Sequence, residues 1–325
     1  MKFSRLTEKT LIDQIKKEFD SSKPGLIQGI GDDAAVVEIG PKKFILTKDL
    51  LIEGTHFDKK SHPPFLLGRK SLNVNLSDIA AMGGTPMYSL LGLSLPESIP
   101  PKWAEEFMAG IQSACREFDV ALIGGDISQS RIISISVTVV GEGTHIIKRD
   151  GACSGDGIYI SGTLGDSAQG LKLSTKGVRL GDDNNTDVLL TAFFDPSPQV
   201  KLGQRISENQ VASSLIDVSD GLSVDLNHIC EQSRVGAEIF AEKIPVSDEL
   251  KVLRDDDMAA CLHGGEDYNL LFTVSEQKKS RLESLKKEYE ISEIGQVFKG
   301  SGVFLVHKDG TRERLKPQGY QHFSD

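Results

Sequence analysis

The chain has 325 residues, more than one hydrophobic core usually serves, so two domains of about 150 residues each are expected. Its 47 acidic residues outnumber its 37 basic ones, which gives a formal net charge of -10. The longest basic run, EQKKSRLESLKKEYE, alternates in sign and is typical of a solvated helix face. A nucleic-acid partner is therefore not expected, because a chain this acidic would repel a polyanion.

Helices and strands are predicted in mixed order along the chain. Apolar residues at helical spacing predict an amphipathic helix at the N-terminus, with Leu11, Ile12, Ile15 and Phe19 on one face. Runs rich in β-branched residues predict strands at 34–39, 43–52, 131–143, 156–165, 213–221, 269–274 and 302–308. Further helices are predicted at 103–118 and 224–233. This order predicts an α/β or α+β protein.

A domain boundary is expected within KRDGACSGDG, residues 148–157, where glycines, small residues and charges interrupt the pattern. We therefore expect one domain over residues 1–150 and a second over residues 151–325. The four cysteines are scattered and form no CxxC pair, which predicts a reduced, cytoplasmic setting without a zinc site. No apolar run has the length of a signal peptide or of a membrane span, so no membrane association is expected.

The stretch GIGDDAA, residues 29–35, begins like a phosphate-binding loop, but a strand-like AAVV follows where a nucleotide loop requires a helix. The chain instead carries aspartates at predicted turns, many of them beside glycines: Asp32, Asp33, Asp49, Asp78, Asp126, Asp217 and Asp220. Carboxylates are the hard oxygen ligands that Mg²⁺ prefers. A shared Mg²⁺ would let them meet a phosphate without repulsion, so the pattern favours a metal-dependent enzyme.

Each of these residues also has an ordinary structural interpretation. An Asp in a Gly-containing turn commonly hydrogen-bonds its own backbone. Asp217 and Asp220 could cap the helix that follows them. His56 stands alone in the sequence, as a partly buried structural histidine would.

Seven blocks taken together identify a family resemblance: GIGDDAAVV, KDLLIEGTHF, NVNLSDIAAMGG, LIGGDIS, GDGIYISGTLGDSAQGL, IDVSDGLSVDL and HGGEDYNLLFTV. In this order they resemble the thiamine-monophosphate kinase family, which belongs to the superfamily of aminoimidazole ribonucleotide synthetase and selenophosphate synthetase. The resemblance covers nearly the whole chain from Gly29. It implies an N-terminal domain that binds ATP and Mg²⁺ and dimerises through its sheet, and a C-terminal α/β domain that completes the site.

The resemblance also implies an activity and a set of site residues. The implied reaction is direct, in-line transfer of the ATP γ-phosphate to thiamine monophosphate, with several Mg²⁺ ions, in a cytoplasmic homodimer. The implied metal ligands are Asp32, Thr47, Lys48, Asp49, Asp78, Asp126, Asp217 and Asp220, with Asp78, Asp126 and Asp220 expected at the phosphoryl transfer. The implied nucleotide contacts are Gly125, Asp126, Arg149 and Ser219, and the implied thiamine contacts are His56, Glu266 and Tyr320.

Three positions depart from the usual family pattern. Lys48 stands where Thr or Ser is common, which leaves the number of bound Mg²⁺ ions open. Ile127 and Gln321 replace a hydroxyl and an acidic residue, and we expect both changes to matter little.

Two other classes of function are alternatives: another ATP-dependent synthetase of the same superfamily, and a non-catalytic sensor. A selenophosphate synthetase would need a reactive cysteine in its N-terminal glycine-rich segment, but no cysteine precedes Cys115. An aminoimidazole ribonucleotide synthetase would present other blocks in place of NLSDIAAMGG and GGEDY. A non-catalytic sensor of nucleotides or thiamine phosphates would have lost metal ligands, whereas all the acidic positions are present.

Overall fold

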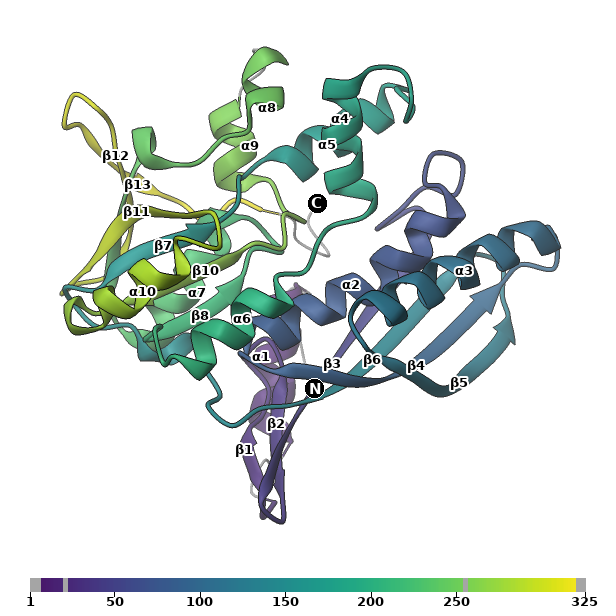
Figure 1. Ribbon diagram of the computed structural model, residues 1–325, viewed down its shortest axis with the longest axis horizontal. Helices are drawn as coiled ribbons and strands as arrows, with labels where there is room; N and C mark the ends of the chain where they lie inside the picture. Colours follow the sequence, from purple (N-terminus) through teal and green to yellow (C-terminus); the bar gives the residue numbers. More distant parts are fainter. Residues whose placement is uncertain (1–6, 20–22, 254–256, 320–325) are drawn as a thin grey trace.

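The protein contains two β-sheets with helices packed between and around them (Figure 1). The computed structural model describes residues 7–19, 23–253 and 257–319. The first sheet has six strands in the order β1-β2-β3-β6-β4-β5. Its strands are β1 (Leu26–Gln28), β2 (Ala35–Ile39), β3 (Lys42–Ile52), β4 (Thr85–Leu95), β5 (Ala121–Gln129) and β6 (Ser134–Glu142). The helices of this half are α1 (Glu8–Glu18), α2 (Pro64–Ala81) and α3 (Pro101–Glu117).

The second sheet has seven strands in the order β13-β12-β9-β11-β7-β10-β8. They are β7 (Gly157–Ser161), β8 (Ser214–Asp217), β9 (Gly236–Phe240), β10 (Leu270–Val274), β11 (Ile291–Phe298), β12 (Gly302–Val306) and β13 (Arg312–Leu315). The helices of this half are α4 (Asp166–Thr175), α5 (Asn184–Phe194), α6 (Val200–Glu208), α7 (Leu222–Ser233), α8 (Asp248–Leu253), α9 (Asp257–His263) and α10 (Lys279–Leu285). Short 3₁₀ turns are η1 (Arg149–Gly151), η2 (Ala241–Lys243) and η3 (Glu276–Lys278).

The expected mixed α/β class is confirmed. The predicted strands correspond to β2, β3, β6, β7, β8, β10 and β12, and the predicted helices to α1, α3 and α7. The expected boundary within residues 148–157 lies in the connection between the last strand of the first sheet and the first strand of the second. The division into 1–150 and 151–325 stays a prediction.

Three of the acidic positions expected at turns lie inside regular elements instead. Asp49 is within β3, Asp78 within α2 and Asp126 within β5. Strand β3 continues through Lys48 and Asp49 because it pairs with β6 along nearly its whole length. Helix α2 was not predicted because it is buried on most of its circumference, so its sequence lacks the apolar stripe of a surface helix.

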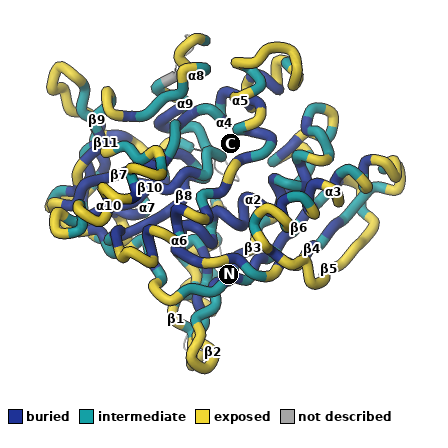
Figure 2. The backbone as a smooth tube through the Cα atoms, viewed as in Figure 1, coloured by how far each residue is buried: buried dark blue, intermediate teal, exposed yellow. Residues whose placement is uncertain are grey.

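Helix α2 is the element that joins the two halves. It contacts β3, β6 and α3 on the side of the first sheet, and α5, α6 and β8 on the side of the second (Figure 1). Figure 2 shows α2 as a buried segment in the middle of the molecule. The hydrophobic core around it is shared, because Leu76 and Ile79 of α2 belong to one buried cluster with Leu202 and Ile206 of α6. The position of α2 therefore fixes how the two sheets meet.

Two glycines let α2 and α3 approach closely. A Cβ at Gly68 would lie 2.1 Å from the carbonyl oxygen of Phe107, and a Cβ at Gly110 would lie 1.9 Å from that of Phe65. Both distances are far shorter than any van der Waals contact, so only glycine fits.

None of the helices within the described ranges combines the length and apolarity that a membrane-spanning helix needs. The cysteines at 115, 153, 230 and 261 are all free thiols.

Replacing Gly68 with alanine should destabilise the protein. Helix propensity alone would make Gly→Ala favourable by about 1 kcal/mol, but the clash with Phe107 should reverse the sign and cost roughly 1–3 kcal/mol. Urea unfolding of the two proteins measures the difference. Equal or higher stability of Gly68→Ala would contradict the close helix contact.

Candidate active site

Three carboxylates from distant parts of the chain meet where the two halves join. One oxygen atom from each of Asp33, Asp78 and Asp217 lies within 4.8 Å of the others. Asp33 stands just before β2, Asp78 lies in the last turn of α2, and Asp217 is the last residue of β8. The group therefore exists only when α2 holds both sheets in place.

Neighbouring hydroxyl groups hold the carboxylates of Asp78 and Asp217, and a side-chain amide holds the backbone of Asp49. Thr47 Oγ1 donates a short hydrogen bond to Asp78 Oδ2, and Ser77 Oγ donates to Asp217 Oδ2 at 2.6 Å. The backbone N–H of Asp49 donates to Asn75 Oδ1 of α2 at 3.0 Å. Each aspartate side chain or backbone is thus tied to a neighbouring element.

Strand alternation separates Lys48 from this group. Thr47 is buried, and Asp49 shares its face of β3 because side chains two residues apart point to the same side. The intervening Lys48 is exposed on the opposite face. The structure therefore brings Thr47 and Asp49 toward Asp78 but not the Lys48 side chain.

Burial and mutual repulsion make these acids reluctant to ionise. Burial, followed by repulsion from Asp49 and Asp217, raises the pKa of Asp78 well above its ordinary value. Burial and the nearby Asp33 raise the pKa of Asp217 to about 8, and burial raises that of Asp49 to about 6. Such shifts are expected when like charges are crowded in a site of low polarity, and a bound cation would reverse them.

The GIGDD turn places its two aspartates differently. Gly31 has a φ of +117°, and its carbonyl accepts a hydrogen bond from Gln232 of α7 at 2.7 Å. Asp33 makes a short ion pair with Arg149 and joins the three-carboxylate group. Asp32 instead accepts from the backbone N–H of Arg149 at 3.4 Å. The resemblance assigned a metal role to Asp32, whereas the structure brings the Asp33 carboxylate to the group.

Arg149 faces the acidic site in η1. Its Nε lies 3.7 Å from Asp32 Oδ1, and the same guanidinium contacts Asp33. This places a cation beside the carboxylates, next to where the resemblance expects nucleotide phosphates.

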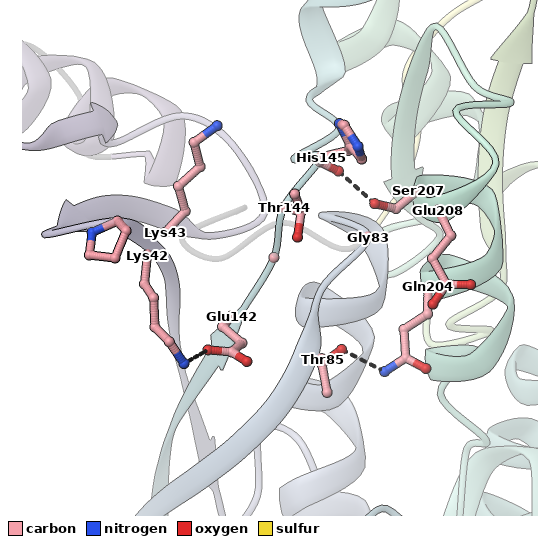
Figure 3. Close-up of a pocket in the computed structure, with 12 residues that line it drawn as sticks. Lys42, Lys43, Gly83, Thr85, Glu142, Thr144, His145, Gln204, Ser207 and Glu208 are labelled. Atoms are coloured by element: carbon pink, nitrogen blue, oxygen red, sulfur yellow. Dashed lines mark hydrogen bonds and ion pairs between the residues drawn. The ribbon is translucent and has the colours of Figure 1, made fainter.

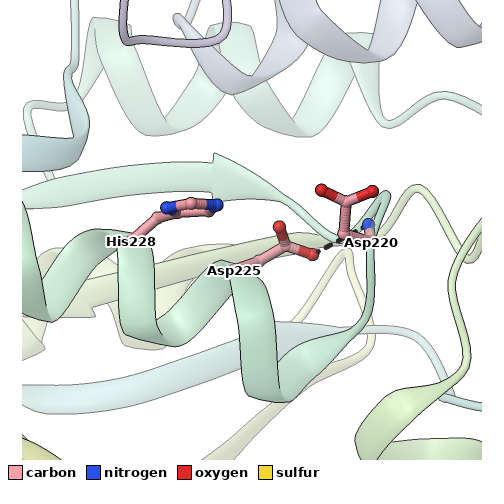
Figure 4. A group of neighbouring side chains, drawn as sticks. All are labelled: Asp220, Asp225 and His228. Atoms are coloured by element: carbon pink, nitrogen blue, oxygen red, sulfur yellow. Dashed lines mark hydrogen bonds between the residues drawn. The ribbon is translucent and has the colours of Figure 1, made fainter. Parts of the chain in front are cut away.

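Asp220 lies in a second acidic group at the start of α7. Its carboxylate is within 4.8 Å of ligand atoms of Asp225 and His228, as Figure 4 shows. Asp225 Oδ2 accepts the backbone N–H groups of Asp220 and Gly221 at 3.1 and 3.0 Å. The helix cap considered for Asp217 and Asp220 is not formed, because α7 has Gly221 as its N-cap and no side-chain hydrogen bond there; Asp225 instead ties the turn that carries Asp220 to the helix.

The expected thiamine contacts lie in two loops. Ile52 donates its backbone N–H to His56 Nδ1 at 3.0 Å. Glu266 is partly exposed, and its backbone N–H donates to the carbonyl of Ser219 at 2.8 Å, which joins an expected thiamine contact to an expected nucleotide contact. Tyr320 lies outside the described residues.

Within one chain, Gly125 and Asp126 lie far from the group of Asp33, Asp78 and Asp217. Both are in β5, the edge strand, and three strand spacings, roughly 14 Å, separate β5 from β3. The register pairs Asp126 with Gly92, Gly92 with Ser136, and Ser136 with Leu50. Cross-strand partners share a face, so Asp126 lies on the face of Leu50, opposite to Asp49.

A separate cavity of about 650 Å³ opens near the start of β3 (Figure 3). Its wall includes Lys43, His145 and the ion pair between Lys42 and Glu142. None of the expected site residues in the described part of the chain lines this cavity. It is therefore distinct from the acidic site.

The fold and site define a member of the AIR synthase related proteins. The N-terminal domain model of that family matches residues 31–143, and its C-terminal domain model matches residues 154–308. Thiamine-monophosphate kinase of Aquifex aeolicus is 38% identical to this chain over 327 residues, which cover 99% of this chain and 100% of the relative. The Salmonella typhimurium enzyme of the same name is 35% identical and covers 95% of this chain, with 97% of the relative covered. The chain belongs to the thiamine-monophosphate kinase family.

Solved structures agree with this assignment. The structure described as AaThiL complexed with AMPPCP and TMP has a TM-score of 0.89 at 38% identity, covering 99% of both chains. Thiamine-monophosphate kinase from Stenotrophomonas maltophilia has a TM-score of 0.77 at 36% identity, covering 93% of this chain and 95% of that one. The family resemblance seen in the sequence is confirmed.

Mg²⁺ should stabilise this protein more at about pH 8 than at about pH 6. Because the folded-state pKa values of Asp217 and Asp49 are raised to about 8 and about 6, their protonated forms favour folding at low pH. That stability is complete below the unfolded pKa of about 4 and is lost as the pH rises toward about 8. If Mg²⁺ binds the deprotonated carboxylates, it should restore this stability.

Thermal unfolding with and without Mg²⁺ at both pH values measures this effect, with Na⁺ at matched ionic strength as the control. An Mg²⁺-dependent increase in Tm that is no larger at the higher pH would contradict the interpretation.

Proposed function

We infer that this chain phosphorylates thiamine monophosphate with ATP and releases thiamine diphosphate and ADP. The observation that carries the inference is the group of Asp33, Asp78 and Asp217, in a chain aligned over its whole length with thiamine-monophosphate kinases. The related AaThiL structure contains AMPPCP and TMP, an analogue of ATP and the acceptor. Neither a sister synthetase nor a sensor explains both facts as well.

Mg²⁺ is the cation that we propose for the carboxylate group. All the ligand atoms are carboxylate oxygens, which suit a hard cation. Asp33 Oδ2 is buried without a hydrogen-bond partner among the described residues, so the site contains an acceptor that the protein itself does not satisfy. We propose that Asp33, Asp78 and Asp217 bind Mg²⁺, with Thr47 and Asp49 close by and Asp220 in the second acidic group. Bound there, Mg²⁺ would neutralise charge on the transferring phosphoryl group.

The residues of the chain would act mainly by alignment and electrostatics. The acceptor is a phosphate that is already ionised near neutral pH, so no general base is needed. We propose that Arg149 and Ser219 contact the nucleotide and that the phosphoryl group moves in line between the two substrates. Alignment of reactants and stabilisation of charge are the usual sources of catalysis in phosphoryl transfer.

We propose that Glu266 and His56 contact the thiamine moiety. A carboxylate suits both the thiazolium cation and the aminopyrimidine, through charge and hydrogen bonding. Tyr320 remains a proposed aromatic contact, by cation–π attraction. A cytoplasmic setting without nucleic-acid or membrane partners remains the expectation for an enzyme that uses ATP.

Incubation with ATP, Mg²⁺ and either thiamine monophosphate or thiamine, with products read by mass spectrometry, tests the proposed activity. We expect thiamine diphosphate and ADP from the monophosphate. A sensor would release no ADP, and a sister synthetase would leave thiamine monophosphate unchanged; either result would refute the assignment.

Asp78→Asn and Glu266→Gln should differ kinetically. Asp78→Asn should lower kcat by orders of magnitude and raise the Mg²⁺ requirement, because it weakens charge stabilisation in the transition state. Glu266→Gln should chiefly raise the KM for thiamine monophosphate and leave the KM for ATP nearly unchanged, because it removes substrate binding. Circular dichroism controls for folding. If Glu266→Gln altered ATP and Mg²⁺ dependence alone, the assignment of Glu266 would be wrong.

We propose that the protein is a homodimer formed through the first sheet. Among the described residues, strand β5 pairs only with β4, and it is exposed along its length, with Ile127 77% exposed. Leu50, Tyr88 and Leu90 are further exposed apolar residues on β3 and β4. An exposed apolar sheet with an open edge favours association. A second chain would also account for Asp126, because that side chain is remote from the carboxylate group of its own chain.

Light scattering should report about twice the chain mass of 35.4 kDa. Co-expression of Asp78→Asn with Asp126→Asn should restore up to roughly a quarter of wild-type activity, because half the dimers would contain one intact site. Each variant expressed alone is the control. A monomer would refute the dimer, and a dimer without recovery would place Asp126 outside the partner's site.

A further inference from the structure

Lys70 of α2 is a fully buried lysine beside the proposed thiamine site. Its ammonium lies 3.1 Å from Glu266 Oε1, and it donates to the carbonyl of Phe193 at 2.8 Å. The same ammonium lies 4.2 Å from the centroid of the Phe193 ring. Glu266 is thus the carboxylate partner of a buried ammonium. An ammonium is rarely buried without such compensation, because its desolvation is costly.

The loop that carries Glu266 is held in an unusual backbone conformation. Glu266 has a φ of +65° and Tyr268 a φ of +52°, values that residues other than glycine seldom adopt. Their N–H groups donate to the carbonyls of Ser219 and Val218, both at 2.8 Å. Between them, the Asp267 carboxylate accepts the N–H groups of Gly165 and Ser167 at the start of α4. The backbone is therefore fixed, and strain of this kind concentrates at functional sites.

Lys70 then fixes the side chain of Glu266, whose orientation the backbone does not determine. The Glu266 side chain is 26% exposed, so one side of it remains open to a ligand, while Oε1 is held by the buried ammonium. A carboxylate held on one oxygen can offer the other to a substrate in a defined direction, which reduces the entropy lost on binding.

Helix α2 also links this contact to the metal group. Lys70 and Asp78 are eight residues apart on one helix, a rise of about 12 Å. Lys70 reaches the loop that carries Glu266, and Asp78 reaches Asp33 and Asp217. A rigid helix thus sets the separation between the group proposed for thiamine and the group proposed for phosphoryl transfer, and that separation is comparable with the length of an extended thiamine monophosphate.

We propose that Lys70 is a positioning residue that orients Glu266 toward thiamine monophosphate and fixes the distance of that contact from the carboxylates around Asp78. The proposal rests on the function proposed above. It adds Lys70, a residue of the first half of the chain, to the determinants of affinity for thiamine monophosphate. The residue proposed to contact the substrate, Glu266, belongs to the second half.

A double-mutant cycle tests whether Lys70 acts through Glu266. Lys70→Met, Glu266→Gln and the double variant are compared with wild type for kcat and for both KM values. Lys70→Met should raise the KM for thiamine monophosphate about tenfold and leave the KM for ATP within about twofold. In the Glu266→Gln background the same change should have less than about a twofold effect. Calorimetric titration with thiamine monophosphate alone should show the same loss of affinity.

His62→Leu is the matched control for a merely structural role. His62 Nε2 lies 3.0 Å from the carbonyl of Phe194, at the same end of α5 that Lys70 caps, and no contact between His62 and Glu266 is seen among the described residues. His62→Leu should lower the Tm without a selective effect on thiamine monophosphate. If Lys70→Met does not fold, Lys70→Gln, which keeps a donor for Phe193, replaces it.

The outcomes separate this inference from the proposed function. Wild-type protein that makes no thiamine diphosphate would refute the function itself. If the wild type is active and Glu266→Gln loses affinity for thiamine monophosphate, the function stands and the role of Lys70 is tested by itself. That role would be overturned if the Lys70 variants changed both KM values equally or changed neither. It would also be overturned if their effect added fully to that of Glu266→Gln. If neither Lys70 variant folds, the ¹⁵N resonance of the Lys70 ammonium in wild type decides. The inference requires that it shift with thiamine monophosphate and not with nucleotide.

Discussion

The repulsion among Asp33, Asp78 and Asp217 is the constraint on which the site depends. Three carboxylates that lie within 4.8 Å of one another and are largely buried oppose folding when they are ionised. The fold tolerates them because Thr47, Ser77 and Arg149 supply donors, and the proposed Mg²⁺ would offset the repulsion that remains. The same three carboxylates therefore affect both the stability of the protein and its proposed chemistry, and Mg²⁺ should favour both.

Helix α2 brings the three carboxylates together. It provides Asp78 to the carboxylate group and Lys70 to the Glu266 loop, and the polar residues between them anchor the second half. Asn73, for example, donates to the carbonyl of Pro196, and Ser77 donates to Asp217. A helix buried on most of its surface can carry several polar groups when most of them find partners, either in neighbouring elements or, as with Ser71 and the carbonyl of Leu67, in the helix itself. Shifting α2 would disturb both ends of the site together.

The sequence predicted the parts of the fold whose patterns are local. The alternation in β3 and β6 and the apolar stripe of α3 are visible without tertiary information. Helix α2 was not, because its burial erases amphipathic periodicity. Most of the candidate site residues came from ordered motifs, but the sequence could not show which of two adjacent aspartates, Asp32 or Asp33, faces the group. Nor could it show Lys70, since its partner Glu266 is almost two hundred residues away and the contact is purely tertiary.

Anomalous diffraction from crystals grown with Mn²⁺ and a non-hydrolysable ATP analogue tests the central claim most directly. Mn²⁺ takes the same oxygen ligands as Mg²⁺ and can be located by its own signal. The account predicts a metal ion with carboxylate oxygens of Asp33, Asp78 and Asp217 as ligands, at about 2.0–2.3 Å, and bridged to the nucleotide phosphates. Nucleotide bound without a metal ion among these three carboxylates would contradict it.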